Sequence, residues 1–494
     1  MQKKSPISAV SAASSTGNAR ISGQQKEQAL GMADYLRPLD MAERLDFIAF
    51  MEYCSYVSAN AAALGIYDFD AEYAIGEVRR NLGNKYLATD FVEYYAGLCS
   101  QNPELPDLRG ISFHIHDLSE VISGWAVASL ESFLPSSSRY TEDVDGSVAQ
   151  STWLYLADIY SSGIAGKDVS EYSSSMSIAE LVVRLADVEG KSVLDFVCGN
   201  GVYLSTALAL GATSICGRDI NAQAVLRARI LCFFANAAVP RDLVASDVLS
   251  SANSTPPVQR VIVAPPLGMR LRERDIRERG YYADVVKTLI GENAAGTLEM
   301  EDFCVAKALA SLTDDGVAVM HVSASFLFHQ QKVRQMLRRA LVEGGYLQTV
   351  IELPGGCIPS TRVKSALLII GKRPSDEGIL IVDLDSKDLT DKGYVAKSRG
   401  RCEITDAGIG WLAKMVEQRD EVPLVSTVVD RERILASGSN LCYATYGDVL
   451  DYGTILDETR STEDILGDIR AAQASIDSLG EQIADILNSI EKKG

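Results

Sequence analysis

Residues 193–204 decide the fold, and they read Val-Leu-Asp-Phe-Val-Cys-Gly-Asn-Gly-Val-Tyr-Leu. The pattern predicts an apolar strand that ends in an acidic residue, a turn that contains Gly199 and Gly201, and a helix after the second glycine. Glycine lets the backbone come close to a bound ligand, and the first turn of a helix offers free N–H groups to an anion. A Gly-x-Gly turn alone is a weak indicator, because any tight connection from a strand to a helix can use one.

The next two predicted strands also end near acidic residues. Asp219 closes the second strand about 20 residues after the glycine turn, where a carboxylate can accept hydrogen bonds from both hydroxyls of a ribose. A nicotinamide-binding domain uses the same arrangement, so the glycine turn and Asp219 together leave the cofactor open. Asp247 follows the third strand, where it can bind the amino group of an adenine or cap the start of a helix.

Outward from this core, short runs rich in β-branched residues alternate with helical segments. The alternation indicates a mostly parallel sheet in an α/β fold. The segment between the last two strands is short and rich in Gly and Pro, so the final strand is predicted to be antiparallel. The seven predicted strands are residues 192–197, 214–220, 243–248, 260–263, 317–322, 349–353 and 366–370.

After the fourth strand the chain reads Val261-Ile-Val-Ala-Pro-Pro-Leu-Gly268. Over about residues 153–372 the order of these motifs resembles the N6-adenine DNA methyltransferases, and in particular the modification (M) subunit of type I restriction-modification systems. The resemblance implies a Rossmann-like class I core with S-adenosyl-L-methionine as cofactor, and methyl transfer to adenine in DNA. The cofactor-binding residues that it implies are Tyr172, Asp195, Cys198, Gly199, Gly201, Asp219 and Asp247.

In that family the catalytic motif is Asn-Pro-Pro followed by Phe or Tyr. The Asn side chain and the first Pro carbonyl accept the amino hydrogens of a flipped adenine, and the aromatic ring stacks on the base. The matching positions here are Ala264, Pro265, Pro266 and Leu267, so the Asn and the aromatic residue are both replaced. Losing one acceptor costs about 2.7 to 4 kcal/mol in the barrier, and losing base stacking costs about 1 to 3 kcal/mol. A catalytically inactive module that binds the cofactor or serves assembly is therefore the alternative function.

The segments outside the core predict further domains. A helical N-terminal domain is expected at 31–135 after a disordered lead-in at 1–30, because Asp40 and Glu43 are spaced as a capping box before Leu45, Ile48 and Met51. The methyltransferase domain is assigned to 147–375 and an accessory region to 376–454. Residues 455–494 carry an a/d heptad seam of a coiled-coil helix. By resemblance this helix packs on a specificity subunit, and packing within the chain is the alternative.

Charge and cysteine usage limit the partners and the compartment. The net charge is 47 minus 66, or −19, which is the wrong sign for a surface that grips DNA by itself. DNA contact would need a local basic patch, although solvated helix faces are an equal alternative. The two candidates are Arg270, Arg272, Arg274, Arg277 and Arg279, and Lys332, Arg334, Arg338 and Arg339.

The nine cysteines show no CxxC pairs and predict free thiols, no metal site and a cytoplasmic protein. Apolar runs are too short for a membrane span. The expected partners are DNA and the specificity subunit, with a second modification subunit and a restriction subunit as further candidates.

Overall fold

The computed structural model describes residues 41–67, 69, 87–111, 146, 149–151, 175–250, 255–271, 281–291, 298–358, 363–398 and 401–447. The chain divides into two units, 1–447 and 448–494, and the described residues all belong to the first. The predicted heptad seam therefore lies outside the described residues, as do Tyr172 and most of the first arginine cluster.

Nine strands form one sheet within the described residues. They are β1 (Ser192–Asp195), β2 (Ser214–Asp219), β3 (Arg241–Ala245), β4 (Val258–Val263), β7 (Leu312–Ser323), β8 (Leu347–Leu353), β9 (Ser365–Gly371), β10 (Ile379–Asp383) and β13 (Ser426–Val429). Their order is β13-β10-β8-β9-β7-β4-β1-β2-β3. All pairings are parallel except those of β9 with β7 and β8 and that of β13 with β10.

The fold predicted from the sequence is confirmed. Each of the seven predicted strands is present, and the last of them, β9, is antiparallel as expected. The third strand begins and ends earlier than predicted, at Arg241 and Ala245, so that Asp247 lies in the loop beyond it. Two strands were not predicted, because β10 and β13 come from the region after residue 375.

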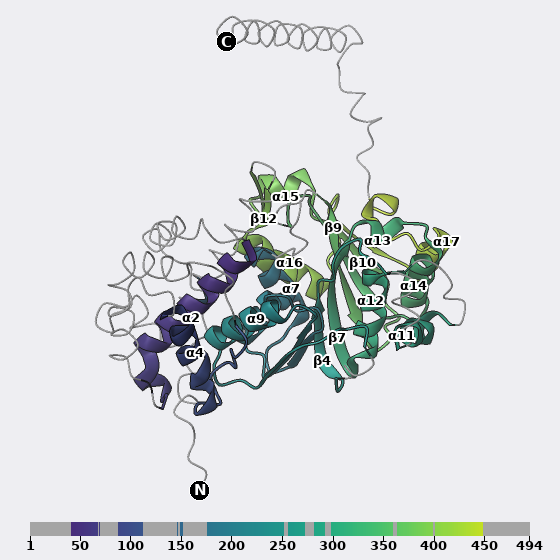
Figure 1. Cartoon of the computed structure of the whole chain (residues 1–494). Helices are drawn as coiled ribbons and strands as arrows, with labels where there is room; N and C mark the ends of the chain where they lie inside the picture. Colours follow the sequence, from purple (N-terminus) through teal and green to yellow (C-terminus); the bar gives the residue numbers. More distant parts are fainter. Residues whose placement is uncertain are drawn as a thin grey trace, which may run out of the picture. The chain divides into compact units, whose positions relative to one another are not determined.

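Helices cover both faces of the sheet, as Figure 1 shows. Because both faces are buried, the central strands are mostly apolar, and every residue of β9 is buried. One face carries α7 (Met176–Ala186), α8 (Val202–Ala209), α9 (Ala222–Ala235) and α16 (Asp406–Gln418). The other carries α11 (Tyr281–Ile290), α12 (Met300–Ala310), α13 (Ser325–Phe328), α14 (Lys332–Glu343) and α17 (Arg431–Ala436).

The N-terminal region is helical where it is described. Its elements are α2 (Met41–Leu64), α4 (Leu87–Gly97) and the short η3 (Leu98–Ser100). The predicted apolar series Leu45, Ile48 and Met51 is buried. The helix α2 is buried around its whole circumference from residue 45 to 58, so it behaves as an internal helix, and it packs against α9.

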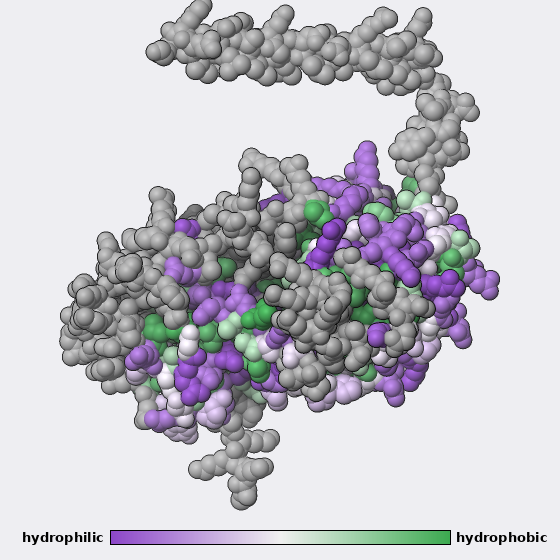
Figure 2. All heavy atoms as spheres, turned by 45° about the vertical axis from the view of Figure 1, so that its right-hand side comes forward, coloured by the Kyte–Doolittle hydropathy of each residue, from purple (hydrophilic) through white to green (hydrophobic). Residues whose placement is uncertain are grey.

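Smaller elements complete the unit. A two-stranded ladder joins β5 (Arg270–Leu271) to β6 (Leu298–Glu299), and a second joins β11 (Val395–Ser398) to β12 (Arg401–Ile404). The remaining elements are α15 (Lys387–Asp391) and η5 (Tyr443–Thr445). On the face seen in Figure 2, hydrophobic side chains form small patches interrupted by hydrophilic ones. Among the described helices, none is both long and apolar enough to cross a membrane.

Candidate functional site

Four predicted site positions lie at the same edge of the sheet. Because β4, β1, β2 and β3 are neighbouring parallel strands, their carboxyl ends meet at one edge, which is where open α/β sheets bind ligands. Asp195 ends β1 and Asp219 ends β2. Asp247 lies two residues beyond β3, and Ala264 directly follows β4. The structure thus brings together the strand ends that the sequence singled out.

The glycine turn is tied to the end of β2. The backbone N–H of Gly199 donates to Oδ2 of Asp219 at 2.8 Å, and that of Asn221 donates to Oδ1 at 2.9 Å. Gly199 and Gly201 have φ of +48° and +78°, a region that favours glycine. A Cβ on Gly199 would meet no atom within 4 Å, so backbone is open to a ligand at this point.

Gly201 serves a different purpose from Gly199. A Cβ added there would lie 2.7 Å from the Cβ of Ala228 and 2.9 Å from its Cα. The missing side chain therefore lets the start of α8 pack closely on α9. Gly201 is the N-cap of α8 and provides no side-chain cap for the N–H groups of the first turn.

Asp195 is directed at the backbone of the turn. Its side chain is buried, with 1% of the residue exposed, and its Oδ1 accepts a hydrogen bond of 3.0 Å from the N–H of Val197. Burial, together with the nearby charge of Asp219, raises the pKa of Asp195 to about 8. This carboxyl group is accordingly placed to shape the turn.

Cys198 and Asp247 also make structural contacts. The N–H of Cys198 donates to the carbonyl of Arg218 at 2.8 Å, and burial raises the pKa of its thiol well above the ordinary value. Asp247 is partly exposed, and its Oδ1 accepts from the N–H of Leu249 at 3.0 Å. The described residues that follow Asp247 form a turn, so this contact caps a turn and is not evidence for the predicted alternative of a helix cap.

One apolar residue at this edge, Ile220, was not among the site residues predicted from the sequence. Ile220 directly follows Asp219 and is 72% exposed, which is unusual for a large apolar side chain at the end of a buried strand. The available signal was its position, since it lies between the acidic residue and the cap Asn221 of α9. Ile220 provides an apolar surface beside the carboxylate of Asp219.

The motif loop follows β4. Pro265 is buried, Ala264 and Leu267 are partly buried, and Pro266 is exposed. The backbone beyond the loop is fixed at several points, because the N–H of Gly268 donates to Oε2 of Glu301 at 3.3 Å. The N–H of Met300 donates to the carbonyl of Met269 at 2.8 Å, next to the β5–β6 ladder.

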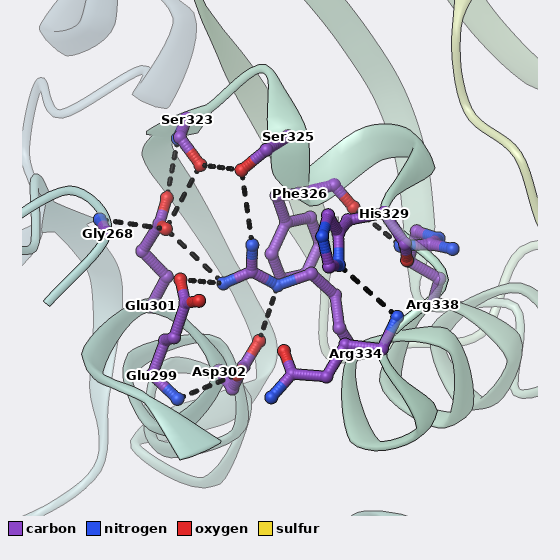
Figure 3. Close-up of polar contacts among 11 residues, drawn as sticks. Gly268, Glu299, Glu301, Asp302, Ser323, Ser325, Phe326, His329, Arg334 and Arg338 are labelled. Atoms are coloured by element: carbon purple, nitrogen blue, oxygen red, sulfur yellow. Dashed lines mark hydrogen bonds and ion pairs between the residues drawn. The ribbon is translucent and has the colours of Figure 1, made fainter. Parts of the chain in front are cut away.

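A buried charged cluster supports the motif loop, as Figure 3 shows. Glu301 is fully buried and reaches from α12 to the end of β7, where Ser323 donates to it from the backbone N–H at 2.5 Å and from Oγ at 3.0 Å. Burial raises the pKa of Glu301. The same carboxylate thus joins the motif loop to the neighbouring strand end.

Arg334 of α14 is the centre of this cluster. Its Nε donates to Asp302 at 2.9 Å, and its Nη2 donates to Glu299 at 2.9 Å and to Glu301 at 3.3 Å. Its guanidinium also lies 5.2 Å from the centre of the Phe326 ring. Burial raises the pKa of Asp302. One guanidinium therefore binds three acidic side chains beneath the loop.

The second predicted basic patch is wrong for two of its four residues. Arg334 and Arg338 are 1% and 0% exposed, so they belong neither to a DNA-binding surface nor to a solvated helix face. Arg338 donates to the carbonyls of Ser439, Phe326 and His329 at 2.7, 2.8 and 3.0 Å. Burial lowers its pKa to about 10. Three backbone acceptors explain why this charge is tolerated inside the protein.

The other described residues of the two predicted patches, Arg270, Lys332 and Arg339, are exposed. Arg339 forms an ion pair of 2.7 Å with Glu343. In the described part of the chain, no group of three His, Cys, Asp or Glu side chains could hold a metal ion. All nine cysteines are free thiols.

Comparisons with known proteins agree with this geometry. The model of the family N-6 DNA Methylase matches residues 155–451. The ribosomal protein L11 methyltransferase of Aliivibrio fischeri (strain MJ11) is 46% identical over 43 residues, which are 9% of this chain and 15% of that protein. The chain thus spans about 15% of the length of this curated relative.

Solved structures match a far larger part of the chain. A type I restriction-modification system methyltransferase subunit from Streptococcus thermophilus has a TM-score of 0.60 at 17% identity, covering 86% of this chain and 99% of that one. A modification subunit of a putative type I restriction enzyme from Vibrio vulnificus YJ016 has a TM-score of 0.56 at 14% identity, covering 83% and 93%. These likenesses show the same fold. Since the family model matches more than half of the sequence, the chain belongs to the N-6 DNA methylase family.

Proposed function

We propose that this chain is the DNA modification subunit of a type I restriction-modification system. In this role it binds S-adenosylmethionine and acts on adenine in DNA that a separate specificity subunit selects. The observation that carries the proposal is the grouping of Asp195, Asp219, Asp247 and the Pro-Pro loop at the ends of four adjacent strands. Membership of the N-6 DNA methylase family supports the reaction class.

The residues of the sheet edge fit this cofactor. Each carboxylate oxygen of Asp219 accepts one backbone N–H, and a carboxylate has about four acceptor sites, so lone pairs remain for the ribose hydroxyls. Ile220 offers an apolar surface for the adenine ring, and Asp247 an acceptor for its amino group. The open backbone at Gly199 suits the methionine end. When bound, S-adenosylmethionine supplies an electrophilic methyl group on its sulfonium.

The motif loop supports a second function, because its chemistry is reduced. Only the Pro265 carbonyl remains to accept an amino hydrogen, since Ala264 has no acceptor and Leu267 has no ring to stack on a base. We infer that methyl transfer by this chain is slow by several orders of magnitude. The second candidate is accordingly a cofactor-binding assembly module that keeps the fold.

The partners follow from the same proposal. With a net charge of −19, this chain needs a partner to supply sequence-specific contact with DNA. We propose that residues 455–494 form a coiled coil with the specificity subunit, and that a second modification subunit and a restriction subunit join the complex. Pull-down of a co-expressed specificity subunit by the full chain, and loss of the complex when this segment is removed, would test that role.

Titration calorimetry and a methyl-transfer assay separate the two functions. The full chain is titrated with S-adenosylmethionine, and transfer of labelled methyl to DNA is then measured with the co-encoded specificity subunit present. Binding together with transfer supports the enzyme, and binding without transfer supports the assembly module. Absence of cofactor binding would reject both.

Restoring the motif tests the argument about the loop. We expect the double variant Ala264→Asn with Leu267→Phe to raise the rate of adenine methylation by at least about 100-fold, since it returns the missing acceptor and the stacking ring. Ala264→Val with Leu267→Ile is the matched control, because it returns neither an acceptor nor a ring, and it should stay near the wild-type rate. A double variant that binds the cofactor but gains no activity would place the defect elsewhere.

A further inference from the structure

A single buried guanidinium connects the N-terminal helix to the glycine turn. Arg227 of α9 is 1% exposed. Its Nε donates to Oδ1 of Asn200 at 2.7 Å, and its Nη1 donates to Oδ1 of Asp46 at 2.5 Å. Asp46 belongs to α2 and is itself buried, so the ion pair lies inside the interface between α2 and α9.

The turn is held from two directions. Asn200 lies between Gly199 and Gly201, both of which have positive φ, so the orientation of its side chain is linked to the path of the whole turn. On one side Asp219 accepts from the N–H of Gly199, and on the other side Arg227 donates to Asn200. The contact with Asp219 comes from the end of a strand of the sheet. The contact with Asn200 comes from a guanidinium that also binds α2.

The packing of α2 on α9 is specific enough to orient that guanidinium. Two tyrosines of α2 lie against two phenylalanines of α9, with ring centres 5.8 Å apart for Tyr56 and Phe233 and 5.4 Å apart for Tyr56 and Phe234. Tyr53 lies 6.0 Å from Phe233. Rigid aromatic contacts of this kind fix the position of Asp46 relative to α9.

We propose that Arg227 is a positioning residue for the methionine end of the cofactor, and that the docking of α2 thereby sets the cofactor affinity. This inference rests on the proposed cofactor site. In the proposed site the nucleoside end lies at Asp219 and its neighbours on the sheet, whereas Arg227 bonds Asn200, which is next to Gly199 in the turn at the methionine end. Loss of Arg227 should therefore weaken binding of the methionine end of the ligand more than binding of its nucleoside end.

Two ligands of different length test this prediction. S-adenosylhomocysteine carries the amino acid end, and 5′-methylthioadenosine lacks it, so the ratio of their dissociation constants reports on the turn alone. The double variant Asp46→Leu with Arg227→Met replaces both charges of the ion pair by apolar side chains, so neither of the two is left buried without the other. We expect it to bind S-adenosylhomocysteine about ten-fold more weakly and 5′-methylthioadenosine with unchanged affinity.

Two further variants make the result decisive. Asn200→Ala removes the acceptor on the turn without touching the ion pair, and it should show the same selective loss. Arg229→Met is the matched control, because Arg229 lies on the same helix and bridges the Asp107 and Leu243 carbonyls at 2.7 and 2.9 Å without reaching the turn. It should bind both ligands as the wild type does.

The outcomes are distinct from those of the proposed function. Unchanged affinity for S-adenosylhomocysteine in the double variant and in Asn200→Ala would overturn the positioning role. Equal weakening of both ligands would overturn it too, since it would indicate general disruption. If the wild-type chain binds neither ligand, the proposed cofactor site fails and this inference falls with it.

Discussion

The cofactor edge and the motif loop lie on adjacent strands, and they differ in what has been kept. At the proposed cofactor edge, defined by Asp195, Asp219, Asp247 and the glycine turn, the polar side chains that the resemblance implies for cofactor binding are present. In the motif loop, residues 264–268, the two side chains that would touch a base are replaced by Ala264 and Leu267. The support beneath the loop is nevertheless complete, with Glu301 bonded to Gly268 and Ser323.

In the motif loop, the residues that hold the backbone in place are therefore not the residues that would carry out the chemistry. The buried cluster around Arg334 fixes the backbone of the motif loop. The two replaced positions, which would contact a base, do not belong to that cluster. The chain thus has a set of buried charges beside a loop with few functional groups.

The largest effect is expected when the support of the loop is broken. Arg334→Met leaves Glu301 and Asp302 buried without their cation, and removing one partner of a buried ion pair costs about 3 to 5 kcal/mol. Urea unfolding at neutral pH measures this loss of stability.

The matched control for Arg334 lies on the same helix. Arg339→Met removes an ion pair with Glu343 in which the two side chains are 64% and 45% exposed, so the free energy of unfolding should stay close to the wild-type value. Similar losses for the two variants would contradict the central role of the cluster under the motif loop.

The second prediction concerns the cofactor edge and the pH dependence of the free energy of unfolding. Because burial raises the pKa of Asp195 to about 8, the folded chain keeps a proton there that the unfolded chain releases. The contribution of this proton to the free energy of unfolding is fully present at acid pH. It is lost as the pH rises through the pKa of Asp195 in the folded chain, by about 1.4 kcal/mol per pH unit.

Asp195→Asn should abolish that dependence, since the amide can still accept from Val197 and cannot ionise. Urea unfolding at pH 5.5, 6.5 and 7.5 should show wild-type stability falling relative to the variant by about 2.7 kcal/mol over the two pH units. Curves that remain parallel would mean that Asp195 ionises normally in the folded chain.

A smaller effect separates the two glycines of the turn. Gly201→Ala should cost about 2 kcal/mol, because the new Cβ would combine strain at positive φ with a clash against Ala228. Gly199→Ala meets open space and should cost only about 1 kcal/mol from its backbone conformation. Thermal unfolding of the two variants compares the costs, and equal values would show that α8 can move away from α9.

Much of the sheet could be predicted from the sequence because its signals are local. Buried parallel strands are short apolar runs, and two of them end where an acidic residue interrupts the run, at Asp195 and Asp219. The antiparallel β9 was predictable because the connection before it is too short for a crossover helix. The grouping of the acidic residues at one edge follows from the same topology.

The buried charges could not be predicted, because their partners are distant in sequence. Arg334 and Arg338 belong to a run of basic residues that is typical of an exposed helix face, and their acceptors come from α12 and from residues near 439. In the same way Glu299, Glu301 and Asp302 match the acidic first turn of a helix. The packing of α14 against α12 is what brings Arg334 to these acidic side chains.

The two strands after residue 375 determine where the chain can be shortened. Ile379–Asp383 pairs with β8, and its four apolar residues from Ile379 to Val382 are completely buried. A fragment that stopped at residue 375 would leave β8 with unpaired backbone N–H and C=O groups and with no neighbour over its apolar side chains. Such an open edge invites pairing between molecules, so a soluble recombinant core has to continue at least through β13.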